Sequence, residues 1–399
     1  MNRLLQKALA AIAALSVAGG ISLAQETPEK LAQETPEKLA QKTPDKFALK
    51  TPEKQIYMAA NAHFDTQWRW NVRQSIGEFL PNTLYQNFAL MEQYPDYKFS
   101  FEGAVKHYWT KEYYPHLYST LVKYVKEGRW YPAGASWDAN DFNVPSAESN
   151  FKNILLAEEF YKAEFGVKSY DIMLPDCFGF GYALPSIASH CGVFAFHTQK
   201  LKWRNNPFYE GGKKWPFEFG IWEGVDGSRI LMAPDGSSYG WNPSGDISDD
   251  PGLEAKVNAS AVGAALRYYG TKSSRLHGDQ GGSPLPSAVE AIASSIPNAG
   301  KYGIRFATTI DIFNDYKDEL TGDKLPVYNG ELLMDVHGTG CYTSNSDCKM
   351  LNRRSEQLGL AAEGAAAAAD WLGVIDYPKY TINDAYRRFI WHQFHDDLP

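Results

Sequence analysis

The sequence predicts an α/β fold: a (β/α)-barrel-like domain of mostly parallel strands over residues 55–335, followed by the start of a helical bundle over residues 336–399. Three observations support this. The chain has 399 residues, of which 44% are hydrophobic and 22% charged, so it has ample apolar material for a core. From Gln55 to about Leu333, short apolar runs alternate with longer amphipathic ones, which is typical of strands alternating with helices. Two long helical patterns then follow.

The first 24 residues have the pattern of an export signal. Arg3 and Lys7 precede an apolar stretch, residues 8–23, and the segment ends in Ser22-Leu23-Ala24, a small-x-small cleavage pattern. An uncleaved anchor is the alternative, but the stretch is short for a span of about 20 residues. We therefore expect a mature chain without a transmembrane span, exported to the periplasm or the extracellular medium.

Residues 25–54 form a linker built on an eight-residue repeat. The unit Gln-Glu-Thr-Pro-Glu-Lys-Leu-Ala recurs with threonines at Thr27, Thr35, Thr43 and Thr51. A proline in every unit interrupts any helix, and the mixture of acids and lysines buries little apolar surface. We expect a tether between the signal and the folded domain.

The charge distribution excludes some classes of partner. The formal charge is −8, and the lysines and arginines are scattered along the chain. This argues against nucleic acid or an anionic membrane as a partner and is compatible with a neutral ligand such as a carbohydrate. The sequence does not indicate an oligomeric state.

The four cysteines lack zinc-finger spacing. An exported chain can form disulfides, and Cys341 with Cys348 is the more plausible pair.

Polar residues follow four predicted strands, residues 56–59, 129–131, 170–174 and 304–307. One predicted helix between them, residues 146–165, begins after Pro145-Ser146 and ends at Gly166. Residues just past the carboxyl ends of parallel strands form the ligand site in barrels and open sheets alike. The candidates at these ends are His63, Asp65, Trp137, Asp138, Asn140, Asp176, Thr308, Thr309 and Asp311.

Some of these residues suit a metal ion. His63 and Asp65 alternate at a strand end, so their side chains project to the same side and can chelate one cation. A strand-end histidine bonded to a neighbouring carboxylate explains the same pair. Asp176 and a histidine near residue 395 would complete a set of two histidines and two carboxylates, which suits zinc. His392 and His395 lie three apart on one face of a predicted helix, residues 382–395, so either could be that ligand.

Another helix is predicted over residues 352–372.

Four motifs resemble those of the retaining α-mannosidases of glycoside hydrolase family 38, in the family's order. They are Ala62-His63-Phe64-Asp65-Thr66-Gln67-Trp68-Arg69-Trp70, Pro175-Asp176-Cys177-Phe178-Gly179, His277-Gly278-Asp279-Gln280-Gly281-Gly282-Ser283-Pro284 and Gln393-Phe394-His395-Asp396-Asp397-Leu398-Pro399. The resemblance spans roughly residues 55 to 399. It implies a seven-stranded, deacetylase-like barrel that acts on mannose-containing glycans.

The resemblance also implies roles for individual residues. One zinc ion would be held by His63, Asp65, Asp176 and His395. Asp176 would double as the nucleophile and Asp279 would be the general acid/base of a double displacement that retains the anomeric configuration.

Four further residues are candidates for substrate binding. Trp68 would offer an aromatic platform for a sugar ring, with core packing as the alternative. The others are Trp137, Asp138 and Tyr342, for which burial and hydrogen bonding explain the residues nearly as well.

Family members usually continue for several hundred residues beyond this point, so the resemblance implies an N-terminal catalytic region truncated at its C-terminus. A non-catalytic or truncated carbohydrate-binding protein is therefore one alternative to an active hydrolase. A metal-dependent polysaccharide deacetylase, which would need a water-activating base, is the other.

Overall fold

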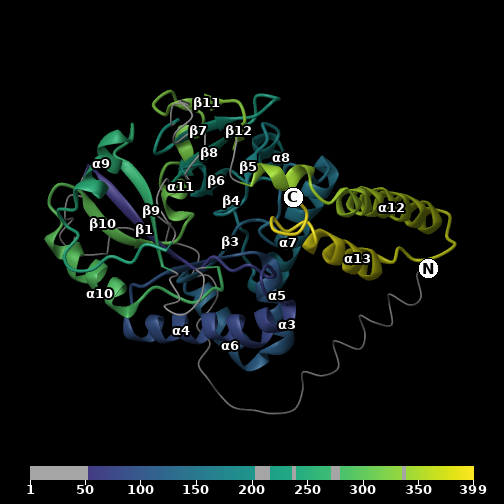
Figure 1. Ribbon diagram of the computed structural model, residues 1–399, viewed down its shortest axis with the longest axis horizontal. Helices are drawn as coiled ribbons and strands as arrows, with labels where there is room; N and C mark the ends of the chain where they lie inside the picture. Colours follow the sequence, from purple (N-terminus) through teal and green to yellow (C-terminus); the bar gives the residue numbers. More distant parts are fainter. Residues whose placement is uncertain (1–52, 203–215, 236–239, 271–278, 335–337) are drawn as a thin grey trace, which may run out of the picture. The chain divides into compact units, whose positions relative to one another are not determined.

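The structure is a computed structural model that describes residues 53–202, 216–235, 240–270, 279–334 and 338–399 (Figure 1). The predicted signal, residues 1–24, and nearly all of the repeat, residues 25–54, lie outside the described residues, as do His277 and Gly278 of the third motif. The part of the chain that is described contains no helix long and apolar enough to cross a membrane.

The first sheet is entirely parallel. Its central strand, β1, pairs with β9 along its whole length, with β10 through residues 55–59, and with β2 through Asn61. β2 in turn pairs with β3. The strands are β1 (Gln55–Asn61), β2 (Phe99–Glu102), β3 (Trp130–Ala133), β9 (Ala264–Gly270) and β10 (Gly303–Ala307).

The second sheet has the order β11-β7-β8-β6-β4 and is parallel except for the β7–β8 pair. Its strands are β4 (Asp171–Met173), β6 (Ala195–Thr198), β7 (Gly220–Glu223), β8 (Arg229–Pro234) and β11 (Val327–Asn329). A small antiparallel ribbon joins β5 (Gly179–Phe180) to β12 (Leu332–Leu333). The predicted α/β class with mostly parallel strands is confirmed, and all four strands predicted above are present.

Burial explains why these segments are strands. β1 is buried from Ile56 to Asn61, on both faces, as expected of a parallel strand covered on two sides. One apolar cluster includes Tyr57 and Ala59 of the first sheet together with Met173, Ala195 and Leu231 of the second. The two sheets therefore share a core.

Helices surround the sheets. α7 begins after Ser146, whose hydroxyl accepts from the Ser149 N–H, and ends at Gly166, where φ is 72°, so both predicted ends are confirmed. The other helices before residue 344 are α3 (Val72–Gln74), the π-helix η2 (Ser75–Phe79), α4 (Leu80–Gln93), α5 (Ala104–Tyr113), α6 (Pro115–Lys126), α8 (Leu184–His190), η3 (Lys200–Lys202), α9 (Pro251–Ala259), α10 (Pro286–Ser295), η4 (Ile296–Asn298), α11 (Asp311–Asp315), η5 (Lys317–Leu320) and η6 (Thr339–Thr343).

The last two helices of the described chain form an antiparallel hairpin (Figure 1). They are α12 (Ser346–Trp371) and α13 (Lys379–Trp391). The prediction of a helix through His395 is wrong, because α13 ends at Trp391. After that point the backbone pairs with the loop that follows β3. The Asp141 N–H donates to the Gln393 carbonyl and the His395 N–H to the Ala139 carbonyl, at 2.9 and 3.3 Å. This tertiary pairing replaces the helical hydrogen bonds.

The predicted Cys341–Cys348 disulfide is also wrong, since both cysteines are free. The Cys348 thiol faces the Asp397 carbonyl at 3.7 Å instead.

Candidate active site

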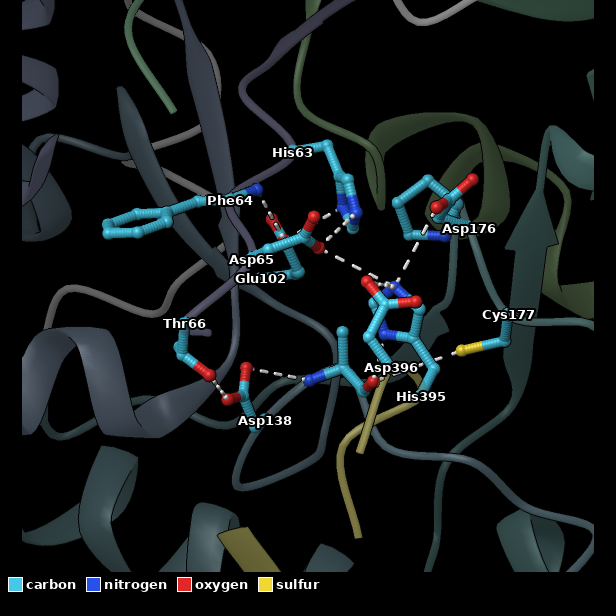
Figure 2. A network of polar contacts seen from close by, with 12 residues as sticks. His63, Phe64, Asp65, Thr66, Glu102, Asp138, Asp176, Cys177, His395 and Asp396 are labelled. Carbon is cyan, nitrogen blue, oxygen red and sulfur yellow. Dashed lines mark hydrogen bonds and ion pairs between the residues drawn. The ribbon is translucent and has the colours of Figure 1, made fainter. Parts of the chain in front are cut away.

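The first part of the site lies at the carboxyl end of β1. His63 and Asp65 are both buried, and His63 Nε2 lies 2.9 Å from Asp65 Oδ1. The Trp70 indole N–H donates to the Asp65 carbonyl at 3.2 Å, which holds the turn after the strand. The predicted projection of both side chains to one side is therefore confirmed (Figure 2).

Glu102, at the end of β2, lies on the Nδ1 side of the His63 ring, opposite Asp65. Its Oε1 lies 3.4 Å from His63 Nδ1 and accepts from the Phe64 N–H at 3.4 Å (Figure 2). Lys106 Nζ lies 2.8 Å from the same oxygen. Burial alone would raise the pKa of Glu102, but Lys106 and His63 outweigh it and lower that pKa to about 2. An ionised carboxylate at Nδ1 leaves Nε2 of His63 directed at Asp65.

Asp176 enters from the second sheet, in the loop after β4. Its side chain is 13% exposed, and its Oδ2 lies 3.8 Å from His395 Nε2. Oδ1 forms an ion pair with Lys200, which follows β6. Burial opposes ionisation of Asp176, but Lys200 and the two histidines outweigh it and lower its pKa below the ordinary range. Asp176 is therefore a carboxylate that stays ionised.

His395 completes the group from the far end of the described chain. Its Nδ1 lies 2.7 Å from the Ala139 carbonyl, so Nδ1 carries a proton and donates it there. Nε2 then faces Asp65 Oδ1 at 3.5 Å and Asp176 Oδ2 at 3.8 Å. Burial opposes protonation, but Asp396, Asp176 and Asp65 outweigh it and raise the pKa of His395 to about 9. Of the two histidines that the sequence left open, His395 is the one in the site, because the His392 side chain is largely exposed and lies near Asp397.

These residues fit a divalent cation. His395 Nε2 is buried, and its nearest carboxylate oxygens stand at or beyond the outer limit of a hydrogen bond, which suits a shared ion better than direct pairing. Within the described residues, three groups bring one ligand atom from each member within 4.8 Å of one another. They are His63, Asp176 and His395; His63, Asp65 and Asp279; and Asp65, His395 and Asp396. All four predicted ligands belong to these groups.

Asp279 lies beside His63 and Asp65 because its segment makes an antiparallel contact with residues 63–65. The Asp65 N–H donates to the Asp279 carbonyl at 2.9 Å, and the Gly281 N–H donates to the His63 carbonyl at 3.0 Å. Gly281 has φ 72°, and a Cβ there would lie 2.4 Å from Thr83 Oγ1, so only glycine fits. The predicted acid/base thus lies beside the predicted metal ligands.

Trp68 is the most exposed aromatic residue of the first motif. Its side chain is 40% exposed, the Arg69 guanidinium lies 4.2 Å from the centre of its ring, and the centre of the Trp70 ring lies at 5.8 Å in an edge-on arrangement. A partly exposed ring three residues after Asp65 suits the apolar face of a sugar.

The other three predicted substrate-binding residues all make contacts within the protein. Trp137 is 2% exposed and packs against Tyr108 and Phe160. Asp138 is buried and accepts from the Thr66 hydroxyl at 2.6 Å (Figure 2). The Tyr342 hydroxyl donates to Asp141 at 2.8 Å. These contacts support the loops that carry the site.

Three residues in the site were not predicted: Glu102, Lys200 and Asp396. Lys200 lies two residues after a strand of the second sheet, so the same strand-end rule would have marked it. Glu102 is the last residue of β2 and Asp396 adjoins His395, positions that neither spacing nor charge distinguishes in the sequence.

Comparisons with known proteins agree with this geometry. The family model described as "Glycosyl hydrolases family 38 N-terminal domain" matches residues 53–331. α-Mannosidase G of Dictyostelium discoideum is 30% identical over 347 residues, which cover 86% of this chain and 30% of that protein. Human α-mannosidase 2C1 is 29% identical over 351 residues, covering 86% of this chain and 31% of that protein. The chain thus spans about a third of the length of these relatives.

The fold also resembles a solved structure. An α-mannosidase from Enterococcus faecalis V583 superposes with a TM-score of 0.70 and 20% sequence identity, covering 86% of this chain and 39% of that one. At this identity the likeness concerns the fold.

Proposed function

The chain belongs to glycosyl hydrolase family 38, and from that premise we propose that it is a zinc-dependent retaining α-mannosidase that removes terminal α-mannosyl residues from glycans. One observation carries the proposal. Asp176 presents a partly exposed, ionised carboxylate inside a cluster of metal-ligating side chains, with a second carboxylate, Asp279, beside the same cluster. A pair of carboxylates with different tasks is what retaining glycosidases need.

The residues that would hold the ion are His63, Asp65, Asp176 and His395. Two imidazoles and two carboxylates form a zinc-like ligand set. A bound zinc ion would orient the mannose ring through its vicinal hydroxyl groups and stabilise charge there. His63 follows a strand of the first sheet and Asp176 a strand of the second, so the proposed ligand set spans both sheets.

The chain's own carboxylates would perform the reaction. In the first step a carboxylate oxygen of Asp176 bonds to the anomeric carbon as the bond between that carbon and the leaving oxygen breaks, and Asp279 donates a proton to the leaving oxygen. In the second step Asp279 takes a proton from water, whose oxygen bonds to the anomeric carbon as the bond to Asp176 breaks. The anomeric configuration is retained. Trp68 would lie against the sugar's apolar face.

The relatives support the substrate class. Both relatives compared above are named α-mannosidases. The first two motifs follow β1 and β4, as residues of a ligand site at strand ends would. The proposed substrate is therefore an α-mannoside in a glycan.

We further propose that strands β1, β2, β3, β4, β6, β8 and β9 form one closed seven-stranded barrel. At one junction of the two sheets, the Ala135 N–H after β3 donates to the Asp171 carbonyl of β4 at 2.7 Å. At the other, the Tyr268 N–H of β9 donates to Asp235 after β8 at 3.1 Å. An experimental structure in which β3 and β4 separate would contradict the closure.

The test of function is hydrolysis of an aryl α-mannoside by the full chain, with zinc or with EDTA, and with Asp176→Ala. We expect zinc-dependent release of the aryl alcohol, retention of configuration by NMR, and a loss on the order of 10⁴-fold or more in kcat for Asp176→Ala. Asp226→Ala is the matched control, because Asp226 is an exposed carboxylate paired with His190; it should keep full activity. Release of acetate from acetylated glycans without cleavage, or sugar binding without turnover, would reject the proposal.

A further inference from the structure

Lys200 is a buried ammonium group that touches the proposed nucleophile. Its side chain is 2% exposed and forms an ion pair with Asp176 Oδ1. We propose that Lys200 is a catalytic residue, which stabilises the negative charge that returns to Asp176 when the glycosyl–enzyme bond breaks. This inference rests on the function proposed above.

The two oxygens of Asp176 have different neighbours. Oδ1 meets Lys200, whereas Oδ2 faces His395 Nε2 at 3.8 Å and so turns toward the metal-ligating cluster. Lys200 therefore pairs with Oδ1 of Asp176 and leaves Oδ2 facing the metal-ligating residues. The orientation of the carboxylate is fixed from both sides.

The position of Lys200 is itself fixed by neighbouring contacts. Its Nζ lies 5.2 Å from the centre of the Phe178 ring. The preceding residue, Gln199, donates from Nε2 to the Pro175 carbonyl at 2.9 Å, which ties the chain after β6 to the loop that carries Asp176. Gln199 and Lys200 thus hold consecutive residues of that loop.

The ion pair between Lys200 and Asp176 should affect the two steps of the reaction differently. A buried ammonium or carboxylate is costly without an opposite charge beside it. In the second step of the reaction, the electron pair of the bond between Asp176 and the anomeric carbon returns to the carboxylate, while the water oxygen bonds to that carbon and Asp279 accepts its proton. An adjacent ammonium lowers the energy of the carboxylate that leaves. In the first step it makes the same carboxylate a less basic nucleophile.

Removing the charge should therefore slow the second step more than the first. With a dinitrophenyl α-mannoside, Lys200→Met should show a burst of dinitrophenol equal to the enzyme concentration and a mannosylated protein by intact mass. Its kcat and KM should fall together, each by about tenfold or more, because the covalent intermediate accumulates. Lys200→Arg keeps the positive charge and should restore kcat and abolish the burst.

A purely structural role gives a different result. A lower kcat without a burst, with KM unchanged or raised, would overturn the catalytic role of Lys200 while leaving the α-mannosidase activity of the wild type standing. If the wild-type chain itself released no dinitrophenol, the function and the role of Lys200 would both be rejected.

Zinc affinity supplies a readout that does not depend on turnover. Losing the ammonium makes the cluster around Asp176 more negative, so Lys200→Met should bind zinc about tenfold more tightly in chelator competition, and Lys200→Arg should match the wild type. Equal or weaker zinc binding by a folded Lys200→Met, checked by circular dichroism, would show that Lys200 does not set the charge on Asp176.

Discussion

His107 is a histidine that the fold requires to be neutral. It is buried on α5, with Nδ1 3.0 Å from the Gly103 carbonyl and Nε2 3.1 Å from the Trp130 indole nitrogen. Trp130 can only donate, so Nε2 accepts and the proton sits on Nδ1. Burial, with a smaller contribution from the charge of Lys106, lowers the pKa of His107 to about 4.

The lowered pKa predicts acid sensitivity. The unfolded chain takes up the proton near its ordinary pKa of 6.5 and the folded chain only near 4. The folded state therefore keeps its full stability above pH 6.5 and loses stability progressively as pH falls from 6.5 to 4. The difference of 2.5 units corresponds to about 3 kcal/mol. Urea unfolding between pH 7 and 4 measures it, and His107→Gln should flatten that dependence by about this amount. Parallel pH profiles for the two proteins would contradict the assignment.

Single residues differ in how far sequence could identify them. His63, Asp65, Asp176 and His395 stand in motifs with a recognisable order, and the structure brings all four together. Glu102 could not be recognised, because its role depends on β2 pairing beside β1, a contact between residues far apart in the chain. Trp137 follows a strand as a ligand-binding residue would, yet its ring turns into the core.

At the scale of elements, α12 holds the segment that carries His395. Lys349 Nζ donates to the carbonyls of Cys341, Ser344 and Leu398 at 3.0, 2.7 and 3.0 Å. One and two turns further along, Asn352 and Glu356 accept from the Gln393 amide at 2.8 and 3.2 Å. The helix thus holds residues on both sides of His395.

Removing this support should loosen the metal site without touching a ligand. Lys349→Met should weaken zinc binding by about tenfold or more in chelator competition, because His395 must be ordered before it binds and each lost hydrogen bond is worth about 1 kcal/mol. Lys379→Met, which removes an exposed lysine of α13, is the matched control and should bind zinc as the wild type does. Equal affinities for the two variants would show that α12 does not position His395.

The same helices show where element prediction succeeds. Both ends of α7 follow from local chemistry, a serine cap and a glycine that adopts positive φ. The end of α13 does not, because residues 393–395 leave the helix to pair with residues 139–141. That exchange depends on the loop after β3, which no local pattern near His395 reveals.

For the whole molecule, the candidate ligands join parts of the chain that are distant in sequence. Asp65 follows a strand of the first sheet, Asp176 follows a strand of the second, and His395 lies in the segment after α13. An ion bound by all three favours the folded state over the unfolded one, in which these residues are apart.

Zinc should therefore raise the Tm of the full chain. At a free concentration of about 100 times Kd, the stabilisation is about 2.7 kcal/mol. His395→Ala should abolish this response, whereas His392→Ala, which removes an exposed histidine three residues earlier, should keep it. The measurement is a thermal melt with zinc and with EDTA. An equal rise in Tm for both variants would place the bound zinc elsewhere.

The position of His395 also sets an order of events during synthesis. The ribosome releases β1 and the loop after β4 long before residue 395, and domains generally fold as their residues emerge. The strands of both sheets can therefore pair while the cluster still lacks its last imidazole. Binding by the complete ligand set comes after residue 395 has been made, by which time all of the described strands are available to pair.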